Sequence, residues 1–136
     1  MDFEIVTPKG SKVKTTASYV SAPGTVGDLG ILPGHRPLIT SLGIGILSYS
    51  HEGRTDYLAV NGGYLEVADD QLVVITETAE VPEEIDVPRA EAALKRAEER
   101  IRDLEGRQGE GLKFAHHARN RATTRLEASK LKKAKV

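Results

Sequence analysis

The residues of this chain whose types and spacing could do chemistry are arginines in its carboxy-terminal half. Arg89 and Arg96 are seven residues apart, on one face of a predicted helix, and Arg121 and Arg125 are one turn apart on a second predicted helix. If these helices close as a hairpin, the guanidinium groups can converge and neutralise a polyphosphate through bidentate hydrogen bonds. Asp86 could then accept from an adenine amino group or a ribose hydroxyl. The alternative is a set of exposed arginines paired with glutamates one turn away.

Catalytic motifs are missing from the sequence. No Gly-rich stretch leads into Gly-Lys-Ser or Gly-Lys-Thr, and neither GxSxG nor HExxH occurs. The chain has no cysteine, which excludes thiol catalysis, disulfides and cysteine-ligated zinc. His116 and His117 are adjacent, so on a helix they point about 100° apart and cannot form an i, i+4 metal pair. We therefore predict no metal site and identify no catalytic residue in the sequence. An enzyme built on the β-domain stays open as an alternative, and it would need acid and base residues that the fold brings together.

The charge is distributed unevenly between the two halves of the chain. Residues 1–82 carry 10 acidic and 5 basic residues, whereas residues 83–136 carry 10 acidic and 14 basic ones. The last thirty residues alone have seven more positive than negative charges. This excess predicts an acidic partner, which could be nucleic acid, nucleotide or protein. No signal peptide is expected, because the amino terminus lacks a basic region followed by an apolar run. No membrane span is expected, because no run of 18 apolar residues occurs.

The first 82 residues are predicted to form an antiparallel β-sandwich. Short segments rich in β-branched and aromatic residues recur with turn signals between them, as Ile44 to Tyr49 before His51-Glu52-Gly53 illustrates. The segment Tyr57 to Val60, then Asn61-Gly62-Gly63, then Tyr64 to Val67 is typical of a β-hairpin with a tight turn. We therefore predict a meander of paired strands.

Residues 83–136 are predicted to form a separate domain, a helical hairpin. Asp86 is a good N-cap, and three glycines interrupt the helical pattern: Gly106, Gly109 and Gly111. The apolar stripe of the first helix is Ala90, Ala93, Leu94, Ala97, Ile101 and Leu104, and that of the second is Ala115, Ala118, Ala122 and Leu126. Because an alanine methyl contributes well under the ~1.5 to 3 kcal/mol of a buried Leu or Ile side chain, the hairpin should be weakly held and mobile.

A run of glycines and prolines, Gly27 to Leu38 (GDLGILPGHRPL), specifies a shaped connection between strands. Gly27, Gly30 and Gly34 can adopt positive φ, while Pro33 and Pro37 fix φ and lack an amide donor. This run and the later NGGYLEV resemble two signatures of the epsilon subunit of F-type ATP synthases, the first being G-[DE]-L-G-I-L-P-G-H-x-P. The resemblance extends over nearly the whole chain and implies the same sandwich-plus-hairpin fold.

The resemblance implies a rotor part of the ATP synthase complex that is not an enzyme by itself. In that family the sandwich binds the gamma subunit and sits on the ring of c subunits, so it helps couple proton-driven rotation to ATP synthesis. Asp28 matches a position facing the c-ring, and His35 matches a position near gamma. The hairpin folds against the sandwich or extends along gamma toward the catalytic alpha and beta subunits, where it blocks ATP hydrolysis. The implied location is the cytoplasmic face of the bacterial plasma membrane, peripheral to it, with the plastid thylakoid left open.

The resemblance also implies a regulatory ligand, ATP, and no required cofactor. In epsilon subunits of thermophilic bacilli an I-D-x-x-R-A motif binds ATP with help from further arginines. This sequence matches the motif and its helpers at Glu80, Ile85, Asp86, Arg89, Ala90, Arg96, Arg121 and Arg125. The Gly-rich linker 105–111 departs from the family and weakens closure of the hairpin.

A different class of protein, a basic nucleic-acid-binding or protein-binding module on a β-sandwich, would use the tail from Arg119 to Lys135. The only aromatic residue near that tail is Phe114, so bases would stack poorly. We therefore expect no nucleic-acid partner.

Overall fold

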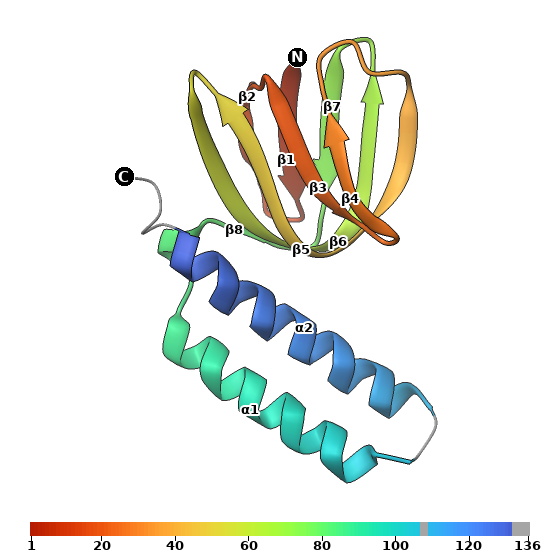
Figure 1. Cartoon of the computed structure of the whole chain (residues 1–136), viewed down its shortest axis with the longest axis vertical. Coiled ribbons are helices and arrows are strands. Elements are labelled where there is room, and N and C mark those ends of the chain that lie inside the picture. The colour runs from red at the N-terminus through yellow and green to blue at the C-terminus, as the bar shows by residue number, and fades with distance from the viewer. Residues whose placement is uncertain (107–108, 132–136) are drawn as a thin grey trace.

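The computed structural model describes residues 1–106 and 109–131. A β-domain is followed by two antiparallel helices that lie beneath it (Figure 1). The strands are β1 (Asp2–Thr7), β2 (Gly10–Thr16), β3 (Tyr19–Gly24), β4 (Gly27–Ile31), β5 (Leu38–His51), β6 (Arg54–Ala68), β7 (Gln71–Ile75) and β8 (Ala79–Glu80). A 3₁₀ turn, η1 (Pro82–Glu84), leads into helices α1 (Val87–Leu104) and α2 (Glu110–Leu131).

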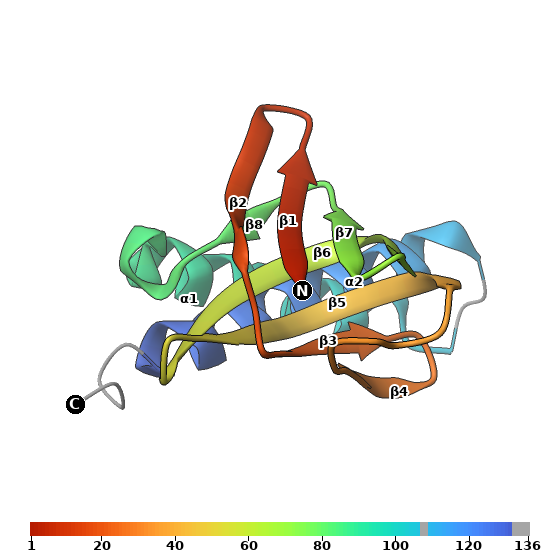
Figure 2. The same cartoon turned by 90° about the horizontal axis from the view of Figure 1, so that it is seen from above.

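The strands form one sheet that curls over its own core. Their order is β2-β1-β7-β6-β5-β3-β4, with β8 also pairing with β6. Figure 2 shows the short strands β1, β2 and β7 crossing above the long strands β5 and β6. All pairs are antiparallel except β1 with β7, which run parallel. The predicted sandwich followed by a helical hairpin is confirmed, with this one parallel pair as a departure from a purely antiparallel sheet.

The core of the β-domain consists of large aliphatic and aromatic side chains that strand alternation turns inward. Phe3 and Ile5 of β1, Leu47 of β5, and Leu58 and Leu65 of β6 are at most 1% exposed. They belong to one continuous cluster that every one of the seven longer strands contributes to or packs against. The β-domain is therefore a well-filled scaffold.

The predicted hairpin at Asn61-Gly62-Gly63 is wrong. These residues lie inside β6, which pairs with β5 in one unbroken register from Leu38↔Val67 to His51↔Arg54. Gly62 and Gly63 have φ of 71° and 112°, and a Cβ on Gly63 would collide with the carbonyl oxygen of Ile75. The glycines thus permit a close approach within a bent strand, which the sequence alone does not distinguish from a turn.

The Gly27 to Leu38 segment is a strand followed by a turn, as its glycines and prolines predict. Gly27 and Gly34 have φ of 134° and 82°, so both need the freedom of glycine. Gly30 does not adopt positive φ; a Cβ there would lie 2.7 Å from the hydroxyl oxygen of Tyr19. The reason for glycine at position 30 is therefore close packing, which corrects the expectation of positive φ.

Helix α2 lies between the sheet and α1. It packs on β5 and β6, where Ala128 joins Ala59 and Ile85 in a second small buried cluster that Ile46 flanks. The two helices meet through alanines, of which Ala90, Ala97, Ala115 and Ala122 are buried. Gly111, expected to interrupt the helical pattern, instead lies in the first turn of α2. The Gly-rich linker can be described except for residues 107 and 108.

Candidate functional site

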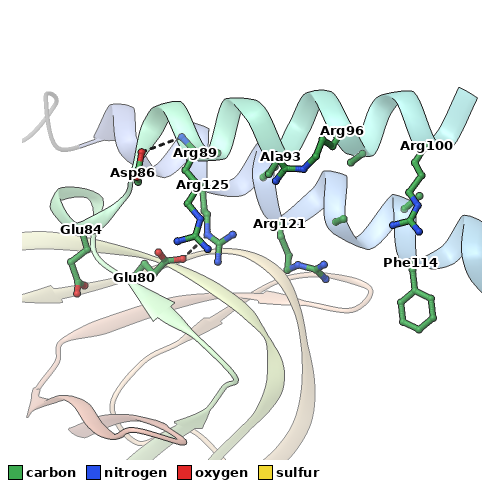
Figure 3. Close-up of a pocket in the computed structure, with 15 residues that line it drawn as sticks. Glu80, Glu84, Asp86, Arg89, Ala93, Arg96, Arg100, Phe114, Arg121 and Arg125 are labelled. Atoms are coloured by element: carbon green, nitrogen blue, oxygen red, sulfur yellow. Dashed lines mark hydrogen bonds and ion pairs between the residues drawn. The ribbon is translucent and has the colours of Figure 1, made fainter.

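A groove with a volume of about 700 Å³ runs between α1 and α2 and ends at β8 and η1. Its walls include seven of the residues matched to the ATP-binding motif, and Figure 3 shows their side chains from both helices. These seven are Glu80, Asp86, Arg89, Ala90, Arg96, Arg121 and Arg125. Residues that are up to 45 positions apart in the chain are therefore brought to one surface.

Asp86 organises the end of the groove nearest the β-domain. It is the N-cap of α1, and its Oδ1 accepts a hydrogen bond of 3.1 Å from the backbone N–H of Arg89. This cap fixes the first turn of α1 and thereby the direction in which Arg89 leaves the helix. Because a carboxylate can accept several hydrogen bonds, Asp86 keeps acceptor capacity toward the groove.

The floor of the groove is formed by alanines. Ala90 and Ala97 of α1 and Ala115 and Ala122 of α2 line it and are buried. Their short side chains allow the helices to approach each other while leaving open space between the longer arginines above. A groove with an apolar floor and converging charged groups on its walls has features of a small-molecule site.

An ion pair connects the groove to the β-domain. Nε of Arg125 donates to Oε1 of Glu80 at 2.6 Å, and both side chains are about one-third exposed. Since Arg125 belongs to α2 and Glu80 to β8, this pair links the hairpin to the sheet (Figure 3). Because the two residues are 45 positions apart in the chain, no local pattern in the sequence indicates that they form a pair.

A second ion pair holds the hinge that precedes α1. Nζ of Lys12 on β2 donates to Oε1 of Glu84 at 2.6 Å, and the same oxygen accepts from the backbone N–H of Val81 at 3.1 Å. The Lys12 ammonium, followed by the Val81 N–H, lowers the pKa of the Glu84 carboxyl below its ordinary value. Glu84 is thus ionised at neutral pH and ties η1 to the edge of the sheet.

Charge is graded along the groove. All three of its carboxylates, Glu80, Glu84 and Asp86, lie at the end near the β-domain. The walls farther along carry arginines and no acid. Among the described residues, no carboxylate forms an ion pair with four of the groove arginines: Arg89, Arg96, Arg100 and Arg121. The alternative of arginines paired with glutamates one turn away does not describe this groove.

One matched residue lies outside the groove, and three groove residues other than alanines were missed. Ile85 is 7% exposed and packs with Ala59 and Ala128 in the cluster between hairpin and sheet. Its side chain therefore helps to dock the hairpin. The residues missed as part of the site are Glu84, Arg100 and Phe114. Only Arg100 had a signal in the sequence, since it follows Arg96 by one helical turn on the same face.

The two predicted interface residues lie on the β-domain. Asp28 is exposed on β4, and His35 lies half-buried in the turn that follows, with its Nδ1 2.7 Å from the carbonyl oxygen of Arg36. That turn is held by Asp70, whose Oδ1 accepts a 3.0 Å hydrogen bond from the N–H of Gly34. Neither residue lines the groove, so the structure has two distinct candidate surfaces.

Large apolar side chains are exposed on the β-domain. Ile39 of β5, Tyr64 of β6 and Ile75 of β7 are 71%, 60% and 53% exposed. Tyr64 lies directly opposite Ile75 in the sheet, and Leu32 in the signature turn is also exposed. Such exposed apolar side chains on neighbouring strands are typical of a protein-binding surface.

Metal sites and membrane-spanning helices are both absent from the described residues. Within residues 1–106 and 109–131, no three His, Cys, Asp or Glu side chains form a group suited to a metal ion. No helix in this described part is both long and apolar enough to cross a membrane. Three lysines of the basic tail, Lys132, Lys133 and Lys135, lie outside the described residues.

Two family models cover nearly the whole chain. Residues 1–82 match the β-sandwich domain of the ATP synthase delta/epsilon chain, and residues 83–130 match its long α-helix domain. The chain belongs to the ATP synthase delta/epsilon family. The resemblance of its two signatures to epsilon subunits is thereby confirmed, and the epsilon assignment agrees with the names of its relatives.

Two similar relatives are epsilon chains from bacteria. The epsilon chain of Pelotomaculum thermopropionicum is 52% identical over 99 residues, which cover 73% of this chain and 74% of the relative. The epsilon chain of Desulfitobacterium hafniense is 39% identical over 128 residues, covering 94% and 95%. Among solved structures, a chain of the Euglena gracilis mitochondrial ATP synthase superposes with a TM-score of 0.79 at 23% identity, covering 93% of this chain and 79% of that one. This likeness supports the fold.

Proposed function

We propose that the chain is a non-catalytic central-stalk subunit of a proton-translocating F-type ATP synthase, linking gamma to the c-ring. The proposal rests on the family to which the chain belongs and on its relatives, which are named ATP synthase epsilon chains. The exposed Ile39, Tyr64 and Ile75 supply an apolar surface suited to gamma. Asp28, exposed on β4, supplies a carboxylate toward the polar loops of the c-ring. The subunit then resides on the cytoplasmic face of the bacterial plasma membrane, peripheral to it.

The helical hairpin is the regulatory part in this proposal. The extended hairpin reaches the catalytic alpha and beta subunits and inhibits ATP hydrolysis. The folded hairpin, as in this structure, is withdrawn from them. Its contacts with the β-domain are small: one cluster around Ile85 and Ala128, the Arg125–Glu80 ion pair, and the Lys12–Glu84 ion pair at the hinge. Partly exposed ion pairs contribute ~1 kcal/mol or less, so a ligand of moderate affinity suffices to shift the balance.

ATP is the ligand that stabilises the folded hairpin. The observation that carries this proposal is the convergence of five arginines from two helices on one groove, four of them without a carboxylate partner among the described residues. Phosphate oxygens can replace those missing partners through charge-assisted hydrogen bonds. Asp86 lies at the acidic end, where it can accept from a base amino group or a ribose hydroxyl. Because both helices contribute arginines, ATP binds the closed hairpin better than the open one.

Calorimetric titration of the full chain with ATP tests the ligand. We expect saturable binding to the wild type and about tenfold weaker binding to Arg121→Ala, which loses a charged hydrogen-bond donor. Arg102→Ala is the matched control, because Arg102 is an exposed arginine of α1 that does not line the groove. No binding to the wild type, or equal loss in both variants, contradicts the assignment of ATP to this groove.

Truncation tests the inhibitory role in the assembled complex. ATP synthase carrying a chain that ends at Glu83 should assemble and couple normally but hydrolyse ATP faster than the intact enzyme, since the hairpin is gone. Unchanged hydrolysis contradicts an inhibitory hairpin, and failure to assemble contradicts the assignment of docking to the β-domain alone.

A further inference from the structure

The end of the groove farthest from Asp86 carries two residues, Arg100 and Phe114, that a single nucleotide bound at the Asp86 end does not need. Arg100 of α1 and Phe114 of α2 both line this end, and Figure 3 shows the Arg100 side chain directed toward the helix that carries Phe114. Phe114 is the only aromatic residue after Tyr64 in the sequence. Its side chain is 67% exposed, so it does not serve the packing between the helices.

An exposed aromatic ring and a guanidinium group that line the same end of a groove are suited to a planar ligand. Nucleobases stack on aromatic side chains and on arginine planes, largely without regard to base identity. No carboxylate lines this end of the groove, so Arg100 keeps its donors for a base or an anionic group. Arg100 and Phe114 therefore provide the elements of a base-binding subsite.

The two ends of the groove are connected by positive charge. Arg100 follows Asp86 by 14 positions along α1, which corresponds to a distance of about 21 Å along the helix axis at 1.5 Å per residue. Arg96 and Arg121, which form no ion pair with the described residues, lie between these ends (Figure 3). The groove thus has a polar acceptor at one end, an arginine track along the middle and an aromatic platform at the other end.

We propose that Arg100 and Phe114 form a second base-binding subsite, so that the groove takes a dinucleoside polyphosphate, with one nucleoside at each end. The inference rests on the proposed nucleotide function of the same groove. A mononucleotide has one base and fills one end. Two nucleosides joined by a phosphate chain fill both, with the anionic chain along Arg96 and Arg121.

Calorimetric titrations of the full chain with three ligands test this subsite. ATP and adenosine tetraphosphate carry one base, whereas diadenosine tetraphosphate carries two. Phe114→Ala should bind diadenosine tetraphosphate about tenfold more weakly than the wild type, since stacking is lost, and should bind the other two ligands unchanged. Phe114→Tyr, which keeps a stacking ring, is the matched control and should bind all three as the wild type does.

The outcomes separate this inference from the proposed function. If ATP and adenosine tetraphosphate bind but Phe114→Ala weakens all three ligands equally or none of them, the second subsite is wrong while the ATP site stands. If no ligand binds the wild type, both are wrong. Because Phe114 is largely exposed, the alanine variant should keep the wild-type circular dichroism spectrum, and a changed spectrum would assign Phe114 a packing role and overturn the subsite.

Discussion

The β-domain and the helical hairpin are packed in opposite ways. The core of the β-domain contains fully buried Leu47, Leu58 and Leu65 within one cluster that spans the sheet. The interface between the helices is lined by alanines, and the cluster that joins the hairpin to the sheet has three buried residues. Burial of a leucine side chain contributes roughly 1.5 to 3 kcal/mol, whereas an alanine methyl contributes far less. We therefore expect the β-domain to keep its structure under conditions in which the hairpin separates from the sheet.

This difference matches the division of roles that we propose. A docking domain has to keep its shape while it transmits rotation, which a dense core provides. A regulatory element has to leave its resting position at small cost, which an alanine interface and two partly exposed ion pairs allow. The contrast in packing can be tested directly, because substitutions in the two regions should have effects of different size and extent.

The largest expected effect is in the β-domain. Leu65→Ala removes a fully buried side chain of β6 from the core and should lower the free energy of unfolding by roughly 2 to 5 kcal/mol. Urea unfolding followed by circular dichroism measures it. Ala97→Gly in α1 is the comparison and should cost only about 1 kcal/mol. Equal losses at the two positions would remove the distinction between the two regions.

A smaller and more local effect is expected at the joint between the regions. Glu80→Gln weakens the ion pair with Arg125 and should destabilise the docked hairpin by about 1 kcal/mol or less. Amide hydrogen exchange should therefore rise in α2 and stay unchanged in β5 and β6. Glu91→Gln, at an exposed position of α1 outside the groove, serves as control. Faster exchange throughout the sheet would mean that the hairpin and the sheet open as one unit.

The smallest expected effect is the pH dependence of the hinge. The pKa of Glu84 is lowered in the folded protein, chiefly by the hydrogen bond from Lys12. The contact therefore stabilises the folded protein at pH values above the Glu84 pKa of the unfolded chain. This stabilisation is lost as the pH falls through the lowered pKa of the folded protein. Its contribution, at most ~1 kcal/mol, is present near pH 7 and fades below about pH 4. Lys12→Met should remove that component, as hydrogen exchange at Val81 across pH would report. An unchanged pH profile in Lys12→Met would mean that the pH dependence does not arise from the Lys12–Glu84 ion pair.

The sequence predicted those parts of the site that local spacing determines. The cap at Asp86 and the shared face of Arg89 and Arg96 follow from helical periodicity, and both are found in the groove. Arg100 satisfies the same periodicity but lies outside the matched motif, and it was therefore not predicted. The pairing of Arg125 with Glu80 depends on how α2 lies on the sheet, which no local pattern specifies.

The fold class could be predicted because alternation and helical stripes differ clearly between the two halves. The error at Gly62 and Gly63 arose because glycine permits both a tight turn and a close strand-to-strand approach. Only the neighbouring Ile75 carbonyl, which a Cβ at Gly63 would strike, distinguishes the two. The placement of Ile85 in the joint cluster depends likewise on Ala59 and Ala128, which are distant in sequence.

The central claim, that ATP favours the folded hairpin, can be tested by one distance measurement. The chain has no cysteine, so Ser11→Cys and Asp103→Cys place one spin label on the edge strand β2 and one near the end of α1. Pulsed electron paramagnetic resonance would record the distance between them in the assembled ATP synthase with and without ATP. We predict that saturating ATP leaves a single population at the separation of the folded structure, and that removing ATP adds a longer one. An identical distribution in both conditions would contradict the account.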